Sequence, residues 1–65
     1  MAFLKLTTHI AKAYGICQWC PPVMRVARKI MRMVREDNPS YGPDEALKHA
    51  MKEFDNNSAK YKKFL

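Results

Sequence analysis

The chain has 65 residues, of which 48% are hydrophobic, and it carries a formal net charge of +6. A chain of this length forms one domain at most and buries only about 60% of its unfolded surface. Its hydrophobic fraction is nevertheless too high for a disordered chain. No apolar run approaches the ~20 residues that a membrane-spanning helix needs. The start of the chain also lacks the apolar core and cleavage site of a secretory signal.

The charge is distributed unevenly along the chain. Residues 1–35 contain seven lysines and arginines and no acidic residue, whereas residues 36–65 contain six acidic residues and five lysines. The first part therefore has a net charge of +7 and the second part has a net charge of −1. Such asymmetry indicates an anionic partner for the first part, which could be a nucleic acid, an acidic protein surface or a lipid surface.

The first expected element is an amphipathic helix over residues 2–14. Apolar residues recur on one side at helical spacing and lysines lie on the other side. Gly15 is well placed to end this helix in a left-handed turn. Because the helix is short, it needs tertiary packing of its apolar face to be stable, either against the same chain or against another chain. The expected apolar stripe comprises Phe3, Leu6, Ile10, Ala13 and Tyr14.

The connector that follows contains Cys17 and Cys20 in a Cys-x-x-Cys spacing and then two prolines. A structural zinc site needs four ligands, and His9 and His49, the other conventional ligands, lack finger-like spacing. A thioredoxin-like role requires a strand that leads into a helix starting at the first cysteine, and that context is missing. We therefore expect two reduced thiols and no cofactor, with Cys17 and Cys20 as the candidates if a metal is bound.

A second helix is expected over residues 22–36. Pro22 suits its first turn, and the residues before Pro39 are pushed out of helical geometry, which ends it. Its apolar stripe is expected to comprise Val23, Val26, Ala27, Ile30, Met33 and Val34.

The other side of this second helix is basic. Four cations are spaced i, i+3, i+4 and i+7, and a fifth follows at the next step. Like charges at this spacing repel one another by a few tenths of a kcal/mol per pair, which a negatively charged partner would relieve. Arginine binds phosphate and carboxylate oxygens in a bidentate manner. The alternative is a solvated face that keeps the protein soluble. The predicted anion-binding residues are Arg25, Arg28, Lys29, Arg32 and Arg35.

A third helix is expected over residues 43–55, with Pro43 and two acidic residues in its first turn. Asn57 or Ser58 can cap a final short helical turn in the tail, where Tyr61, Phe64 and Leu65 can pack back on the core. No strand pattern is present, so the predicted fold is all-α. The expected apolar face of the third helix comprises Ala46, Leu47, Ala50, Met51 and Phe54.

Residues 38–54 read Asn-Pro-x-Tyr-x-x-x-Glu-Ala-Leu-x-x-Ala-x-Lys-x-Phe. This spacing is similar to the second half of the YABBY domain and, more loosely, to HMG boxes, in which a basic helix precedes the Asn-Pro turn. Large DNA viruses also encode small proteins with this kind of hairpin. The resemblance covers about residues 21–54 and implies a helical hairpin that contacts phosphates through its basic helix, with Lys48 and Lys52 as additional contacts. The chain departs from these families because it has no four-ligand zinc finger and no assignable minor-groove wedge.

The single domain, residues 1–65, is thus expected to contain an N-terminal helix, a connector, a hairpin and a tail. The chain has no nucleophile–base–acid set and no glycine-rich phosphate loop, so we expect no enzyme activity. The favoured function is architectural or packaging binding of nucleic acid through its phosphates, inside cells, in a nucleus or in a virion. A mitochondrial location is the alternative, because residues 1–15 are amphipathic, basic and free of acids, as in transit segments. The alternative function is an accessory subunit of a virion shell, a ribosome or a mitochondrial complex, docking through apolar helix faces and arginines. The four parts are residues 1–15, 16–22, 22–55 and 56–65.

Overall fold

The structure is a computed structural model that describes residues 2–65. The described chain consists of helices joined by short connectors and contains no strand, which confirms the all-α prediction. Each of the three predicted helices is present, with ends within one residue of the expected ones, and the predicted C-terminal turn is a short fourth helix followed by a 3₁₀ turn. The elements are α1 (Ala2–Tyr14), α2 (Pro21–Asp37), α3 (Pro43–Asn56), α4 (Ser58–Tyr61) and η1 (Lys62–Phe64).

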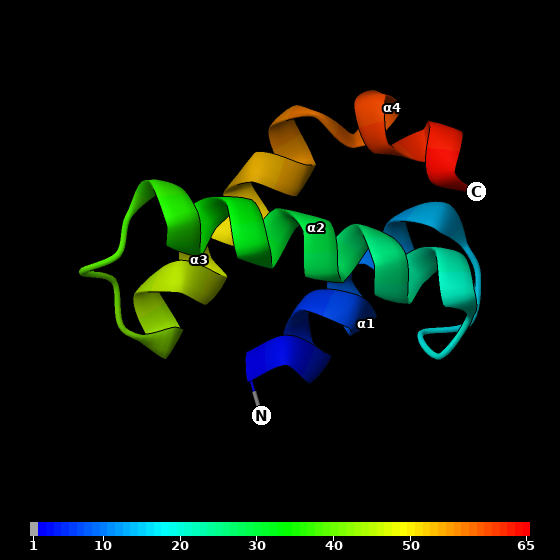
Figure 1. Cartoon of the computed structure of the whole chain (residues 1–65). Helices are drawn as coiled ribbons and strands as arrows, with labels where there is room; N and C mark the ends of the chain where they lie inside the picture. The colour runs from blue at the N-terminus through cyan, green and yellow to red at the C-terminus, as the bar shows by residue number, and fades with distance from the viewer. Residues whose placement is uncertain (1) are drawn as a thin grey trace.

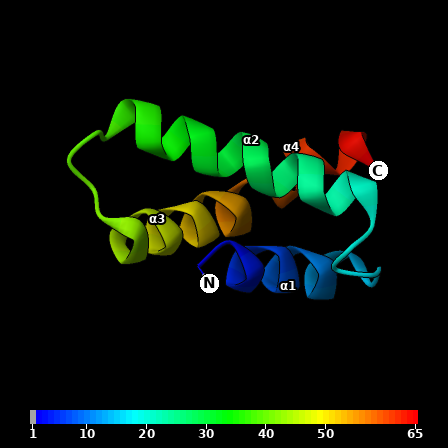
Figure 2. The same ribbon diagram turned by 60° about the horizontal axis from the view of Figure 1, so that its bottom comes forward.

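The helices form two layers. α2 lies across one side of the molecule, and α1 and α3 pack beneath it (Figure 2). α4 and η1 fold back beside the N-terminal half of α2 (Figure 1). The molecule measures 32 × 23 × 16 Å, so every helix lies at the surface and keeps one outward face. Among the described helices, none has the length and apolar character required to cross a bilayer.

The helix ends follow from local residues. Gly15 has a φ of 68° and ends α1, as expected of a glycine in the left-handed region. Pro21 begins α2 and Pro43 begins α3, at positions where the missing N–H has no intrahelical partner to lose. The side-chain amide of Asn38 donates to the Val34 carbonyl oxygen at 3.1 Å and closes the C-terminal end of α2.

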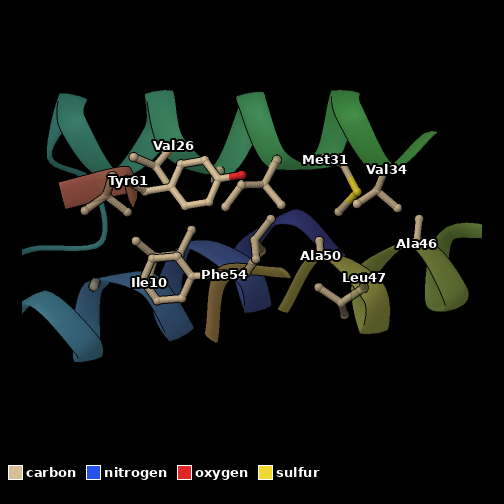
Figure 3. Packing of buried hydrophobic residues seen from close by; sticks show 14 residues of the cluster. Ile10, Val26, Met31, Val34, Ala46, Leu47, Ala50, Phe54 and Tyr61 are labelled. Atoms are coloured by element: carbon tan, nitrogen blue, oxygen red, sulfur yellow. The ribbon is translucent and has the colours of Figure 1, made fainter. Parts of the chain in front are cut away.

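The core lies between α2 and the lower layer formed by α1 and α3 (Figure 3). Phe54 is central to it: its ring meets Tyr14 edge-on at 5.3 Å and lies 6.5 Å from the ring of Tyr61. The apolar face of α1 is therefore covered within the same chain. The buried apolar residues are Leu6, Ile10, Ala11, Val23, Val26, Ala27, Ile30, Met31, Val34, Ala46, Leu47, Ala50, Phe54 and Tyr61.

Two core positions predicted from helical spacing are wrong. Ala13 is exposed, and Thr7 is buried instead. The Thr7 hydroxyl donates to the Leu4 carbonyl oxygen at 2.9 Å, which satisfies this polar group inside the core. On α2, Met31 is buried and Met33 is only half-buried. Helical spacing predicts Met33 in the apolar stripe and leaves Met31 outside it, so the structure reverses the two positions.

A hydrogen-bond cluster fixes the C-terminal segment. The Tyr61 hydroxyl donates to Glu53 Oε2 at 2.9 Å, and the Tyr14 hydroxyl donates to the Ser58 carbonyl oxygen at 2.8 Å. Asn57 occupies the N-cap position of α4, but its side chain does not cap this helix as predicted. It donates instead to the carbonyl oxygen and to Oε2 of Glu53, both at 3.2 Å.

Three tail residues were expected to pack back on the core. Tyr61 is buried in the core, and Phe64 packs against the edge of the core. Leu65 remains 50% exposed, so its predicted packing is not observed.

Candidate anion-binding surface

The five cations predicted on α2 lie on its outward side. The buried residues of α2 face α1 and α3, and the basic residues fall opposite them on the helix. All five are exposed, and they extend over about 15 Å of helix at 1.5 Å per residue. The structure therefore brings the predicted α2 residues together on one surface. We call this surface the α2 basic face; it consists of Arg25, Arg28, Lys29, Arg32 and Arg35.

The charges of the α2 basic face are not neutralised within the described part of the chain. Both ion pairs found in residues 2–65 involve a histidine: His9 with Asp55 at 2.6 Å and His49 with Glu45 at 3.1 Å. Glu36 borders two shallow recesses between the arginines, at the C-terminal end of the face. The negative charge beside the face is therefore concentrated at one end, and most of its length is purely cationic.

The C-terminal turn adds a cation that sequence reasoning missed. Lys29 Nζ lies 5.6 Å from the centroid of the Phe64 ring, and Lys63 Nζ lies 5.4 Å from the same centroid. Both contacts have cation–π geometry. Lys63 thus joins the edge of the α2 basic face. No local signal could have shown this, because the contact depends on how the tail packs against α2.

Lys48 and Lys52 lie on a different surface. They border a groove that α3 shares with Lys5 of α1, and no residue of α2 lines this groove. Asp44 and Asp55 line it too, so its charge is mixed. The structure therefore divides the seven predicted residues between two surfaces, and only the α2 basic face is strongly cationic.

Cys17 and Cys20 are free thiols at opposite ends of a tight turn. The Trp19 N–H donates to Cys17 Sγ at 3.2 Å. His9 and His49 contact carboxylates elsewhere in the molecule. Within residues 2–65, no three or more histidine, cysteine, aspartate and glutamate side chains gather closely enough to hold a metal ion. Within the part of the chain that the structure describes, Cys17 and Cys20 therefore provide two metal ligands and no third residue joins them.

No protein family model matches the chain, and neither a curated protein nor a solved structure is significantly similar to it. The resemblance of residues 38–54 to YABBY domains and HMG boxes therefore stays a prediction. The exposure and the unneutralised charge of the α2 basic face are the observations from which a function can be inferred.

Proposed function

We propose that the protein binds nucleic acid through its phosphates, in an architectural or packaging role, with the α2 basic face as the contact surface. The observation that carries this proposal is a row of five exposed cations on one helix, with no salt-bridge partner in the described chain. Four of the five are arginines, whose planar guanidinium groups bind two phosphate oxygens at once.

The composition of α2 suits phosphate contact and lacks the amide side chains that recognise adenine. Asparagine and glutamine, which read adenine in the major groove, are absent from α2. The major groove of duplex DNA is about 12 Å wide and admits an α-helix. A single exposed helix with cations along its length can therefore approach several phosphates together. We infer that binding is largely electrostatic and tolerant of sequence.

The helical hairpin formed by α2 and α3 holds the α2 basic face in place. α2, the turn after it and α3 are the elements to which the YABBY and HMG-box resemblance refers. Ala46 and Ala50 of α3 are fully buried in the core beneath α2. The packing of α3 against α2 sets the direction in which the α2 basic face points.

Binding to a mixed-sequence DNA duplex, followed by fluorescence anisotropy at low salt, tests the proposal. Because Arg25, Arg28 and Arg32 are exposed, their triple replacement by alanine should preserve the fold while weakening binding by at least about tenfold. The matched control removes three positive charges from the other surface, through alanine at Lys5, Lys48 and Lys52. It should weaken binding far less. Equal losses in the two variants would contradict the assignment to α2. The helical circular dichroism spectrum of each variant checks that it is folded.

The second candidate function is an accessory subunit of a larger assembly. It is favoured by exposed apolar residues at one end of the molecule, where Trp19 is 58% exposed. The apolar faces of α1, α2 and α3, however, already cover one another. We therefore expect the isolated chain to unfold cooperatively as a monomer in metal-free buffer. A chain that folds only with a copurifying protein would favour the subunit function instead.

A further inference from the structure

The end of the molecule that carries the connector has two thiols and an uncovered apolar surface. Cys17 is exposed and Cys20 is half-buried, and both are free. Trp19 is 58% exposed and Ile16 is 37% exposed. The C-terminal residue Leu65, which is 50% exposed, lies at the same end of the molecule (Figures 1 and 2). Two nucleophilic ligands and several unpartnered apolar side chains therefore share one region.

The turn holds the first thiol in a setting that suits a metal-bound thiolate. The Cys20 N–H donates to the Cys17 carbonyl oxygen at 3.1 Å, and a turn of this kind keeps the two Cα atoms within about 7 Å. The Trp19 N–H donates to Cys17 Sγ at 3.2 Å. Hydrogen bonds from the outer shell to a ligand atom orient it toward the metal.

The same turn is tied to α1, which fixes its position on the molecule. Gln18 Oε1 lies 2.6 Å from Thr8 Oγ1. The side chain of Gln18 is half-buried, while its neighbours Cys17 and Trp19 are exposed. Gln18 therefore anchors the turn to α1, while the Cys17 thiol and the Trp19 indole ring are exposed to solvent.

One chain supplies only half of a tetrahedral site. Structural zinc takes four ligands, commonly all cysteine, and the described residues bring no third ligand to Cys17 and Cys20. The imidazole groups of His9 and His49 contact Asp55 and Glu45 instead. A second copy of the chain offers a chemically identical pair of thiols, and two-fold association is the commonest arrangement of identical chains.

We propose that two copies of the chain bind one Zn²⁺ between them, with Cys17 and Cys20 of each copy as its four ligands. Each of the four thiols gives up its proton to solvent when it binds the metal. The association also covers Trp19 and Ile16, which a single chain leaves exposed. This inference does not depend on nucleic acid being the partner of α2.

Cobalt titration of the full chain tests the site, in metal-free buffer with a phosphine reductant that keeps both cysteines as thiols. Co²⁺ bound by four thiolates in a tetrahedron gives intense visible d–d bands and a near-ultraviolet thiolate charge-transfer band. We expect saturation at one Co²⁺ per two chains and displacement of the cobalt by Zn²⁺. In sedimentation experiments, Zn²⁺ should double the mass of the protein, and a chelator should restore the monomer.

Cysteine variants locate the ligands. Cys17→Ser and Cys20→Ser should each lose the four-thiolate spectrum and the zinc-dependent dimer, while His9→Ala should keep both. Trp19→Ala should keep the spectrum at saturating metal but shift dimerisation to higher protein concentration.

Three results would overturn the proposal: one metal per chain in a monomer, no thiolate–cobalt band, or a dimer that forms equally well without metal. An unchanged helical circular dichroism spectrum shows that a lost signal is not caused by unfolding.

Discussion

Gly15 adopts a φ of 68°, in the region that side chains rarely occupy. A Cβ atom added there would have no heavy atom within 4 Å, so Gly15→Ala introduces backbone strain without a steric clash. We expect this substitution to lower the free energy of unfolding by about 1–2 kcal/mol, measured by urea denaturation. A loss below about 0.5 kcal/mol would contradict a left-handed end to α1.

Tyr61 couples the stability of the fold to alkaline pH. Burial, reinforced by the hydrogen bond to Glu53 and its negative charge, raises the pKa of Tyr61 from 10.0 to about 12. Tyr61 in the unfolded chain therefore ionises at lower pH than in the folded protein. Its contribution to stability is complete below pH 10 and is lost as the pH rises from about 10 to about 12.

Comparison with Tyr61→Phe isolates this effect. Across that pH range, the free energy of unfolding of the unsubstituted protein should fall by up to about 3 kcal/mol more than that of the variant. Lysines titrate in the same range, but they are common to both proteins, so the difference between the two pH profiles reports Tyr61. Parallel profiles would show that Tyr61 is not held in its protonated form by the fold.

The burial of individual residues was harder to predict than the helices that carry them. Met31 and Met33 lie on opposite flanks of the α2 stripe, and helical spacing does not say which flank α3 covers. Figure 3 shows Met31 beside Val34 above α3. Ala13 falls on the α1 stripe, but it borders an open recess formed with the C-terminal segment. Both outcomes depend on tertiary packing, which a single helix does not encode.

At the scale of elements, helix ends were predictable because local residues define them. Prolines begin α2 and α3, Gly15 ends α1, and Asn38 with Pro39 ends α2. α4 is different, because its anchor is the tertiary contact of Tyr61 with Glu53. The sequence indicated a short turn whose aromatic residues pack back on the core, but it could not identify Glu53 as the hydrogen-bond partner of Tyr61.

The N-terminal end of α3 offers a direct test of how this helix begins. Gly42 is its N-cap residue and provides no side-chain cap, and a Cβ atom there would meet nothing within 4 Å. Gly42→Ser would create a Ser-x-x-Glu capping box with Glu45. We expect an increase in the free energy of unfolding of about 0.5 kcal/mol by thermal denaturation.

Gly42→Ala is the matched control, because alanine has no acceptor for the N–H groups of the first turn and should not stabilise the protein. A serine variant no more stable than the alanine variant would contradict this assignment of the helix start.

At the scale of the whole molecule, α2 has two roles. One side builds the core with α1 and α3, and the opposite side carries the α2 basic face. The spacing of its cations predicted the five residues of the face, whereas a negatively charged partner stays a prediction. This spacing could not predict that Lys63 would join the five residues or that Lys48 and Lys52 would lie apart. These positions follow from how the tail and α3 pack, which links residues far apart in the sequence.

The salt dependence of binding to duplex DNA tests the central claim most directly. If the five cations of the α2 basic face each neutralise one phosphate, the logarithm of the binding constant should fall linearly with the logarithm of salt concentration, with a slope of about −4.5. Alanine at Arg25, Arg28 and Arg32 should reduce the magnitude of that slope by about 3. Absence of binding at low salt, or a slope that these three substitutions leave unchanged, would contradict phosphate contact by α2.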